Sequence, residues 1–185
     1  MKISISSRIT EHSDNKEKSF LSLDSFIKLA SKNKFDGVSL RPSMISTQSS
    51  EYLVNQAQKL FKVNNMKVSM ITSNIHLAKN DELASDILRN ITPSLDLAEK
   101  LKTSLIRIMI KNSDDIFYAK KALDEAKERN LKLIQQTHWG TLAETLDETV
   151  TLIKTINRPN FGITFEPANL MACGSKFNKN ALNQL

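Results

Sequence analysis

The chain contains a single cysteine, Cys173, so it cannot form an internal disulfide. It has no apolar run long enough to cross a membrane, and its first ten residues, MKISISSRIT, lack the apolar segment of a secretory signal peptide. With only four glycines it shows no phosphate-binding glycine loop, and it contains neither a zinc-binding signature nor a nucleophile elbow. From these absences we expect a cytoplasmic protein that does not contact membranes.

Positive charge is in moderate excess, with 26 Lys and Arg against 20 Asp and Glu and a formal net charge of +6. Such an excess can indicate an anionic partner such as nucleic acid. The basic residues are, however, spread over several segments, with acids between them and no interleaved aromatic residues. A solvated surface is therefore the preferred interpretation, and we expect no nucleic-acid partner.

The composition, 40% hydrophobic and without a shift along the chain, predicts one domain over residues 1–185. Apolar strands alternate with amphipathic helices about every 30 residues, the spacing of a strand and its crossover helix. No hairpin signal separates the strands, so we expect them to be parallel. Strands are expected at residues 3–8, 38–41, 67–72, 105–110, 131–135 and 161–165, and helices are expected to begin near Ser22, Ser49 or Ser50, Leu83, Pro93, Ser113 and Thr145.

Local signals at the helices support this division. Thr145 and Glu148 have the spacing of a capping box, and Thr92-Pro93 predicts that a helix kinks or restarts there. Apolar residues at helical spacing mark the expected inner faces. In the second helix these are Leu53, Ala57, Leu60 and Phe61, and in the helix after Thr145 they are Leu146, Val150 and Ile153.

Two architectures fit such a chain, a closed eight-fold barrel and an open doubly wound sheet. Strands of an open sheet are nearly all apolar, whereas residues 106–111 alternate between isoleucines and Arg107, Met109 and Lys111. In a barrel one face meets the helices and the other looks inward, so we expect a TIM (β/α)8-type barrel. Its interior would be shared by Ser4, Ser6, Arg8, Ser39, Arg41, Arg107, Lys111, Gln136, His138, Thr164 and Glu166.

The number of units falls short of a full barrel. An eight-fold barrel takes ~250 residues, and the sequence given ends after the sixth strand, inside an expected helix at residues 180–185. We therefore expect a barrel that lacks its last two βα units. The first and sixth strands would then have open edges, which predicts self-association into a homo-oligomer.

Three segments, FDGVSLR at residues 35–41, THWGTL at 137–142 and PNFGITFEPANL at 159–170, resemble the xylose-isomerase-like TIM-barrel superfamily in their order and spacing. This group includes sugar-phosphate isomerases and epimerases and, more distantly, the abasic-site endonucleases of AP endonuclease family 2. The resemblance covers essentially the whole chain and supplies strands one to six of eight.

The resemblance also implies a divalent metal of the Mn, Mg or Zn class, held by a Glu after strand five, an Asp after strand six and ligands from strands seven and eight. In this chain Gln136 and Glu166 occupy the first two positions. An amide can lend a neutral oxygen to a hard cation but cannot abstract a proton, whereas Glu166 keeps the charge. We expect weak metal binding by Glu166 and Gln136 at most.

Glu166 and His138 are the expected catalytic residues, because both project inward at the carboxyl ends of strands. A structural ion pair for Glu166 and a buried, satisfied His138 are the alternatives. Arg8, Arg41 and Lys111 also end strands and could bind a phosphate or carboxylate, or else serve as interior counter-ions. The other candidate substrate contacts are His76, Gln136, Asn169 and Trp139, the last of which could stack on a sugar or only pack.

The leading hypothesis is a sugar-phosphate isomerase or epimerase that removes a proton next to a carbonyl and passes through an enediolate. Its partner would be a small carbohydrate or sugar phosphate. The alternative is a non-catalytic, truncated barrel that binds a small anion or serves in assembly. An abasic-site endonuclease would need a multi-metal cluster that three histidines and this site do not supply.

Overall fold

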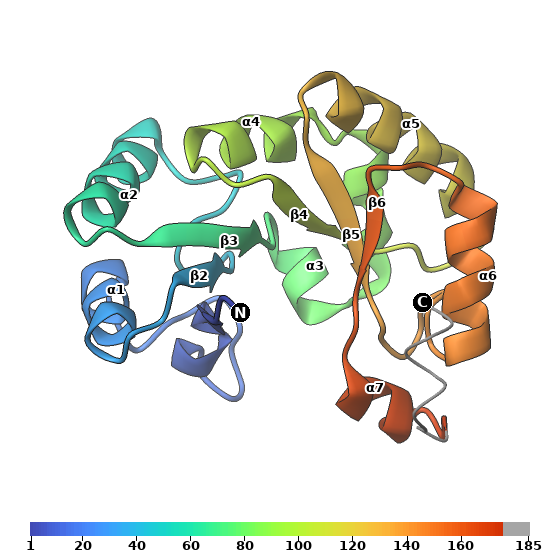
Figure 1. The fold of residues 1–185 in the computed structure, drawn as a ribbon, viewed down its shortest axis with the longest axis horizontal. Coiled ribbons are helices and arrows are strands. Elements are labelled where there is room, and N and C mark those ends of the chain that lie inside the picture. The colour runs from blue at the N-terminus through green and yellow to red at the C-terminus, as the bar shows by residue number, and fades with distance from the viewer. Residues whose placement is uncertain (176–185) are drawn as a thin grey trace. The chain divides into compact units, whose positions relative to one another are not determined.

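The computed structural model describes residues 1–175. They form two compact units, residues 1–84 with 92–107 and residues 85–91 with the chain from 108 onward, and each unit is described by itself. Six strands in the described residues follow their chain order in the sheet, β1-β2-β3-β4-β5-β6, with helices between them (Figure 1). The expected succession of βα units is confirmed, while the helix expected at residues 180–185 lies outside the described residues.

The six strands and the helices α1, α2, α4, α5 and α6 lie within a few residues of their expected positions, whereas the helix expected near Leu83 is a 3₁₀ segment and the short helices α3 and α7 were not expected. The strands are β1 Ser4–Ser6, β2 Gly37–Leu40, β3 Lys67–Ile71, β4 Leu105–Ile108, β5 Lys132–Gln136 and β6 Phe161–Thr164. The α-helices are α1 Leu23–Lys32, α2 Glu51–Val63, α3 Ile75–Lys79, α4 Thr92–Lys100, α5 Asp115–Glu128, α6 Leu146–Ile156 and α7 Pro167–Ala172. Two 3₁₀ segments are η1 Ser7–Thr10 and η2 Glu82–Arg89.

The helix termini repeat the same local chemistry. The side chains of Ser22, Ser50 and Thr145 each accept a hydrogen bond from the backbone N–H three residues on, and Thr145 completes the expected capping box with Glu148. The turns after the helices contain a residue in the left-handed conformation, where asparagine is favoured among non-glycine residues. These residues are Lys34, Asn65, Lys102, Asn130 and Asn157. The recurrence supports the interpretation of the chain as repeated βα units.

In the first unit, strands β1 to β4 pair in parallel, with Ile5 opposite Val38 and Ile71 opposite Ile106. Helices α1 and α2 lie beside this part of the sheet (Figure 1). Gly37 permits a close approach of β2 and β3, since a Cβ there would lie 2.8 Å from the backbone oxygen of Lys67.

In the second unit, β5 and β6 pair in parallel with Gln136 opposite Thr164. The buried side chain of Asn160 connects α5 to this pair, because its Nδ2 donates to Leu123 O at 2.8 Å and to Leu131 O at 3.2 Å. Both strands therefore end at the same edge, which places the residues after Gln136 and Thr164 close together.

Two strands, β1 and β4, are shorter than expected by two residues or more. β1 ends at Ser6 because the Ser6 side chain accepts from Arg8 N and the chain turns into the 3₁₀ segment η1. At its start, Ile3 lies outside the strand and is 52% exposed. β4 ends at Ile108, and Ile110 N then donates to the side-chain oxygen of Gln135 at 2.8 Å.

The inner faces of two helices differ from the expectation. In α2, Leu53 is 49% exposed and the buried residues are Val54, Ala57 and Phe61. In α6, Leu146, Val150 and Ile153 are only half-buried, and the buried residues are instead Thr149, Leu152 and Ile156. Neighbouring stripes of both helices carry apolar side chains, so packing rather than periodicity determines which stripe is innermost.

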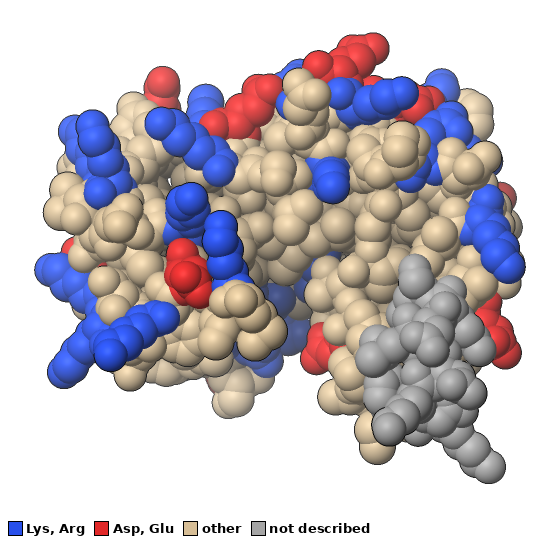
Figure 2. Space-filling model, in the orientation of Figure 1, with Lys and Arg blue, Asp and Glu red and all other residues tan. Residues whose placement is uncertain are grey.

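The strands at the two ends of the sheet each have one neighbour in the described residues, β2 for β1 and β5 for β6. Self-association through these edges stays a prediction. Among residues 1–175 no helix combines the length and the apolar character needed to cross a membrane. Figure 2 shows Lys and Arg side chains scattered over the visible face with Asp and Glu among them.

Candidate functional site

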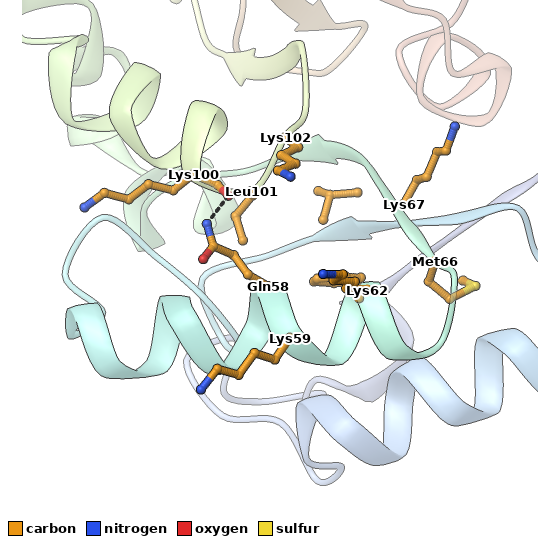
Figure 3. Close-up of a pocket in the computed structure, with 10 residues that line it drawn as sticks. Gln58, Lys59, Lys62, Met66, Lys67, Lys100, Leu101 and Lys102 are labelled. Carbon is orange, nitrogen blue, oxygen red and sulfur yellow. Dashed lines mark hydrogen bonds between the residues drawn. The ribbon is translucent and has the colours of Figure 1, made fainter.

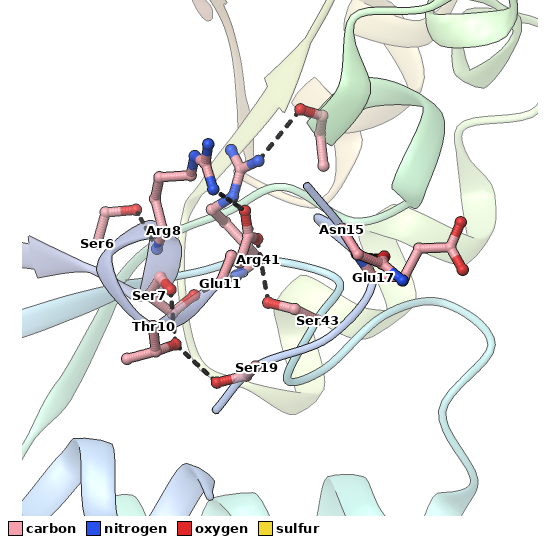
Figure 4. Close-up of polar contacts among 11 residues, drawn as sticks. Ser6, Ser7, Arg8, Thr10, Glu11, Asn15, Glu17, Ser19, Arg41 and Ser43 are labelled. Atoms are coloured by element: carbon pink, nitrogen blue, oxygen red, sulfur yellow. Dashed lines mark hydrogen bonds and ion pairs between the residues drawn. The ribbon is translucent and has the colours of Figure 1, made fainter. Parts of the chain in front are cut away.

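A buried acid organises two arginines in the first unit. Glu11 Oε1 accepts a 2.7 Å hydrogen bond from Arg41 Nε, and Glu11 Oε2 accepts one of 3.1 Å from Arg8 Nη1 (Figure 4). Ser43 Oγ donates to Glu11 Oε1 at 3.0 Å. The Glu11 side chain is fully buried, Arg41 is 9% exposed and Arg8 is 43% exposed. Arg8 is thus the member of this cluster that can reach a ligand.

The backbone around Glu11 is fixed by short side chains. Ser7 Oγ accepts from Arg41 N at 3.0 Å, and Thr10 Oγ1 accepts from Ser19 Oγ at 2.8 Å. Arg41 Nη2 also donates to Ala78 O at 3.1 Å. Arg41 therefore joins the end of β2 to η1 and α3, and its guanidinium is held in one orientation.

Lys16 lies in the same electrostatic environment. Its pKa falls below the usual 10.5 because of partial burial and then the charges of Arg8 and Arg41, which outweigh the opposing effect of Glu11. The two arginines that bond to Glu11 and the nearby Lys16 carry more positive charge than one buried carboxylate offsets, which leaves a net positive charge. Such a cluster can bind a phosphate or a carboxylate.

The structure confirms that Arg8 and Arg41 come together, but Arg8 belongs to η1 and not to a strand end. His76 lies on α3, with Nδ1 2.9 Å from Asp81 Oδ2. Arg107 is buried, as the barrel interpretation requires. Sequence reasoning missed Glu11 and Lys16; the i, i+3 spacing of Arg8 and Glu11 was the only available signal.

In the second unit, Gln136 and Glu166 contact each other. Gln136 is the last residue of β5, Glu166 follows β6, and Gln136 Nε2 donates a hydrogen bond to Glu166 Oε2. Both side chains are partly buried. The amide orients the carboxylate through Oε2.

Thr137 holds this pair in place. Its Oγ1 accepts from Glu166 N at 2.9 Å, and its backbone oxygen accepts from Asn169 Nδ2 at 2.9 Å. The structure therefore brings Gln136, Glu166 and Asn169 around one buried threonine. Asn169 lies on α7, a short helix that the sequence did not predict, and its amide nitrogen joins this helix to the loop after β5. Its expected contact with substrate or metal stays a prediction.

His138 and Trp139 lie on the loop after β5. His138 Nδ1 is 3.0 Å from Trp139 O, and the two rings are tilted with centroids 5.9 Å apart. Trp139 is 63% exposed, so its face is open to solvent. Lys111, expected to end a strand, instead precedes α5, and its backbone N–H donates to Asp115 Oδ2 at 2.9 Å.

The donor set around Glu166 does not fit the metal that the resemblance implies. Within residues 1–175 no group of three or more His, Cys, Asp or Glu side chains could hold a metal ion. Gln136 turns its amide nitrogen, which is not a ligand, toward Glu166. One carboxylate beside a hydrogen-bond donor is a poor site for a hard divalent cation.

A known protein family matches most of the chain. The family model described as xylose isomerase-like TIM barrel matches residues 27–183. The chain belongs to this family. No curated protein matches it in sequence.

Solved structures show the xylose isomerase-like fold over the whole chain. The chain is similar to the probable 3-DHS dehydratase AsbF from Bacillus anthracis, with 17% identity, a TM-score of 0.74, and 100% of this chain and 68% of that one covered. It is also similar to a xylose isomerase domain protein from Planctomyces limnophilus, with 15% identity, a TM-score of 0.74, and 98% and 69% covered. A third similar structure is a D-allulose 3-epimerase from Methylomonas sp., with 12% identity, a TM-score of 0.68, and 92% of this chain and 64% of that one covered.

Proposed function

We propose that this protein is a sugar isomerase of the xylose isomerase-like family in which the Glu166 carboxylate transfers the proton. The observation that carries the proposal is the position of Glu166, after the carboxyl end of β6 and oriented by Gln136 from the neighbouring strand. In TIM-barrel enzymes the catalytic groups lie at this end of the strands. Gln136 engages Oε2, which leaves Oε1 to accept a proton from substrate.

The reaction class follows from a single carboxylate. Aldose–ketose isomerisation moves a proton between adjacent carbons on one face of an enediolate, so one base can remove and return it, while the proton on the second oxygen is released to water and the first oxygen takes one up from water. Epimerisation inverts a carbon and needs a proton donor on the opposite face. His138 is the candidate for that second group, and isomerisation is the reaction that Glu166 can support alone.

The proposed substrate class is a small carbohydrate, with a phosphate or carboxylate as an additional group. The similar epimerase from Methylomonas sp. has been solved in complex with D-allulose, which supports sugars as the first compounds to assay. The cluster of Arg8 and Lys16 supports an anionic group.

Turnover assays on three sugars test this proposal. D-Allulose, D-fructose and D-fructose 6-phosphate would be incubated with the protein, and aldose and ketose products would be separated by chromatography. Glu166→Gln should abolish turnover, whereas Glu128→Gln, the same change at an exposed acid on α5, should leave it unchanged. Equal rates for the two variants would refute the role of Glu166.

A second candidate is a non-catalytic, anion-binding barrel. The observation in its favour is the Arg8, Arg41 and Lys16 cluster beside a donor set that does not fit a metal. It predicts saturable sulfate or phosphate binding that Arg8→Gln weakens, with no turnover of any sugar in the panel.

A further inference from the structure

A basic pocket lies in the first unit beside the start of β3. Its walls come from the last two turns of α2, the first residues of β3, and the end of α4 with the turn that follows, and its volume is about 750 Å³ (Figure 3). β2 and β3 are parallel. The pocket lies at the amino end of β3 and Arg41 follows the carboxyl end of β2, so the two lie at opposite ends of these strands. The pocket is therefore separate from the arginine cluster.

The floor of the pocket is apolar. Phe61 contributes from the last turns of α2, Leu101 from the turn after α4, Met66 from the residue before β3, and Val68 from β3 itself. All four side chains are between 5% and 7% exposed. A flat organic group can cover this floor and remove its remaining surface from water.

The rim of the pocket is strongly cationic. Five of the ten lining residues are lysines, and none is acidic. The lysines are Lys59, Lys62, Lys67, Lys100 and Lys102. Within residues 1–175 their ammonium groups form no ion pair or hydrogen bond with other side chains. Such a rim is complementary to a ligand with several negative charges.

Helix-dipole compensation explains only part of this rim. Lys62 and Lys100 lie in the last turns of α2 and α4, where cations stabilise the helix end. Lys59, Lys67 and Lys102 lie outside those last turns, so the helix dipoles do not account for them, and no lining residue is acidic. A bound anion would supply the negative charge that the lining lacks.

We propose that this pocket binds an organic polyphosphate of the nucleoside triphosphate type, with its ring on the apolar floor and its phosphates among the lysines. The volume is that of a small-molecule site, which is too small for a folded partner. Lysine binds phosphate as a point charge, and no arginine is present for bidentate recognition of a carboxylate. The site does not depend on Glu166 or on any isomerase activity.

Isothermal titration of the full chain with ATP, without magnesium, tests the proposal. We expect saturable 1:1 binding, and binding of inorganic triphosphate that is about tenfold weaker because it has no ring for the floor. The double variant Lys62→Gln/Lys102→Gln should weaken ATP binding by about tenfold or more. The control Lys32→Gln/Lys127→Gln alters the net charge equally at exposed lysines outside the pocket and should leave affinity within about twofold. Thermal midpoints of both variants report whether they fold.

Three results would overturn the proposal. An equal loss of affinity in the control variant would indicate diffuse electrostatic attraction. Triphosphate binding as tight as ATP binding would show that the apolar floor takes no part. A ten-nucleotide single-stranded DNA that displaces ATP, and does so at a lower concentration than the ATP it displaces, would instead show that the lysines form a nucleic-acid-binding surface.

Discussion

The carboxylate of Glu11 and the guanidinium of Arg41 form a buried ion pair, with 2.7 Å between Glu11 Oε1 and Arg41 Nε. The two residues are 30 positions apart in the sequence and come from η1 and the end of β2. Because Arg8 and Ser43 bond to the same carboxylate, Glu11 is the positioning residue of the cluster.

Glu11→Gln should destabilise the fold, because it leaves the buried Arg41 without a negative partner. Loss of one member of a buried pair costs about 3 kcal/mol, measurable by urea unfolding. Glu17→Gln is the matched control: Glu17 pairs with Lys79 at the surface, so this variant should unfold almost like the parent. Equal unfolding midpoints for the two variants would contradict the role given to Glu11.

Gln136→Glu should create affinity for a divalent cation. The change places a second carboxylate against Glu166, and repulsion between them should lower the thermal midpoint in the presence of a chelator. Manganese should restore stability and bind about tenfold or more tightly than to the parent. Calorimetry with manganese measures this directly. Tight binding in the parent that survives Glu166→Gln would place the cation elsewhere.

Anion binding at the arginine cluster should depend on the charge of Lys16. The folded protein holds its pKa below 10.5, so between the lowered value and 10.5 the unfolded chain binds more protons. Without ligand, the contribution of Lys16 to stability therefore rises with pH in that window. Sulfate keeps its charge throughout, so its affinity should fall as Lys16 deprotonates.

Titrations with sulfate from about pH 8 to about pH 10 check this dependence. Lys16→Arg should keep the affinity at the upper end, because arginine stays protonated. Lys18→Arg, two residues away, should behave like the parent. An unchanged affinity across the range in the parent would show that Lys16 does not contact the anion.

Gly37→Ala should destabilise the first unit. The added Cβ would lie 2.8 Å from a backbone oxygen of Lys67, so the β2–β3 pair must shift, at a cost of about 2 kcal/mol. At Gly162 a Cβ would meet only the side-chain Cγ2 of Ile134 at 3.2 Å, and that atom can move. Gly162→Ala should therefore be the milder variant in urea unfolding, and the reverse order would contradict the close approach at Gly37.

The sequence predicted those features of the fold that local chemistry determines. The capping box of Thr145 and Glu148 and the restart at Thr92-Pro93 depend on neighbouring residues, and both are confirmed. The end of β4 was wrong because it depends on Gln135, whose side chain accepts from Ile110 N across 25 positions. Long-range hydrogen bonds of this kind have no periodic signal.

The candidate site was predicted only in part, because some of its hydrogen bonds also join residues that are far apart in the sequence. Alternation placed Gln136 and Glu166 among the inward-facing residues, the family resemblance singled them out as a pair, and the structure joins them by a hydrogen bond. Neither signal gave a hint that Thr137 would bind both Glu166 N and Asn169. Glu11 was missed because it lies in a polar loop, where its one signal, the i, i+3 spacing from Arg8, does not distinguish a buried acid from a solvated one.

Incorporation of solvent deuterium tests the central claim, proton transfer by Glu166, most directly. The protein would be incubated in D2O with D-fructose and with D-fructose 6-phosphate, and NMR would follow loss of the proton signal at the carbon next to the carbonyl. This exchange is visible even where no isomer accumulates. The account predicts exchange in the parent and in Glu128→Gln, and none in Glu166→Gln. Exchange that persists in Glu166→Gln would show that another group removes the proton.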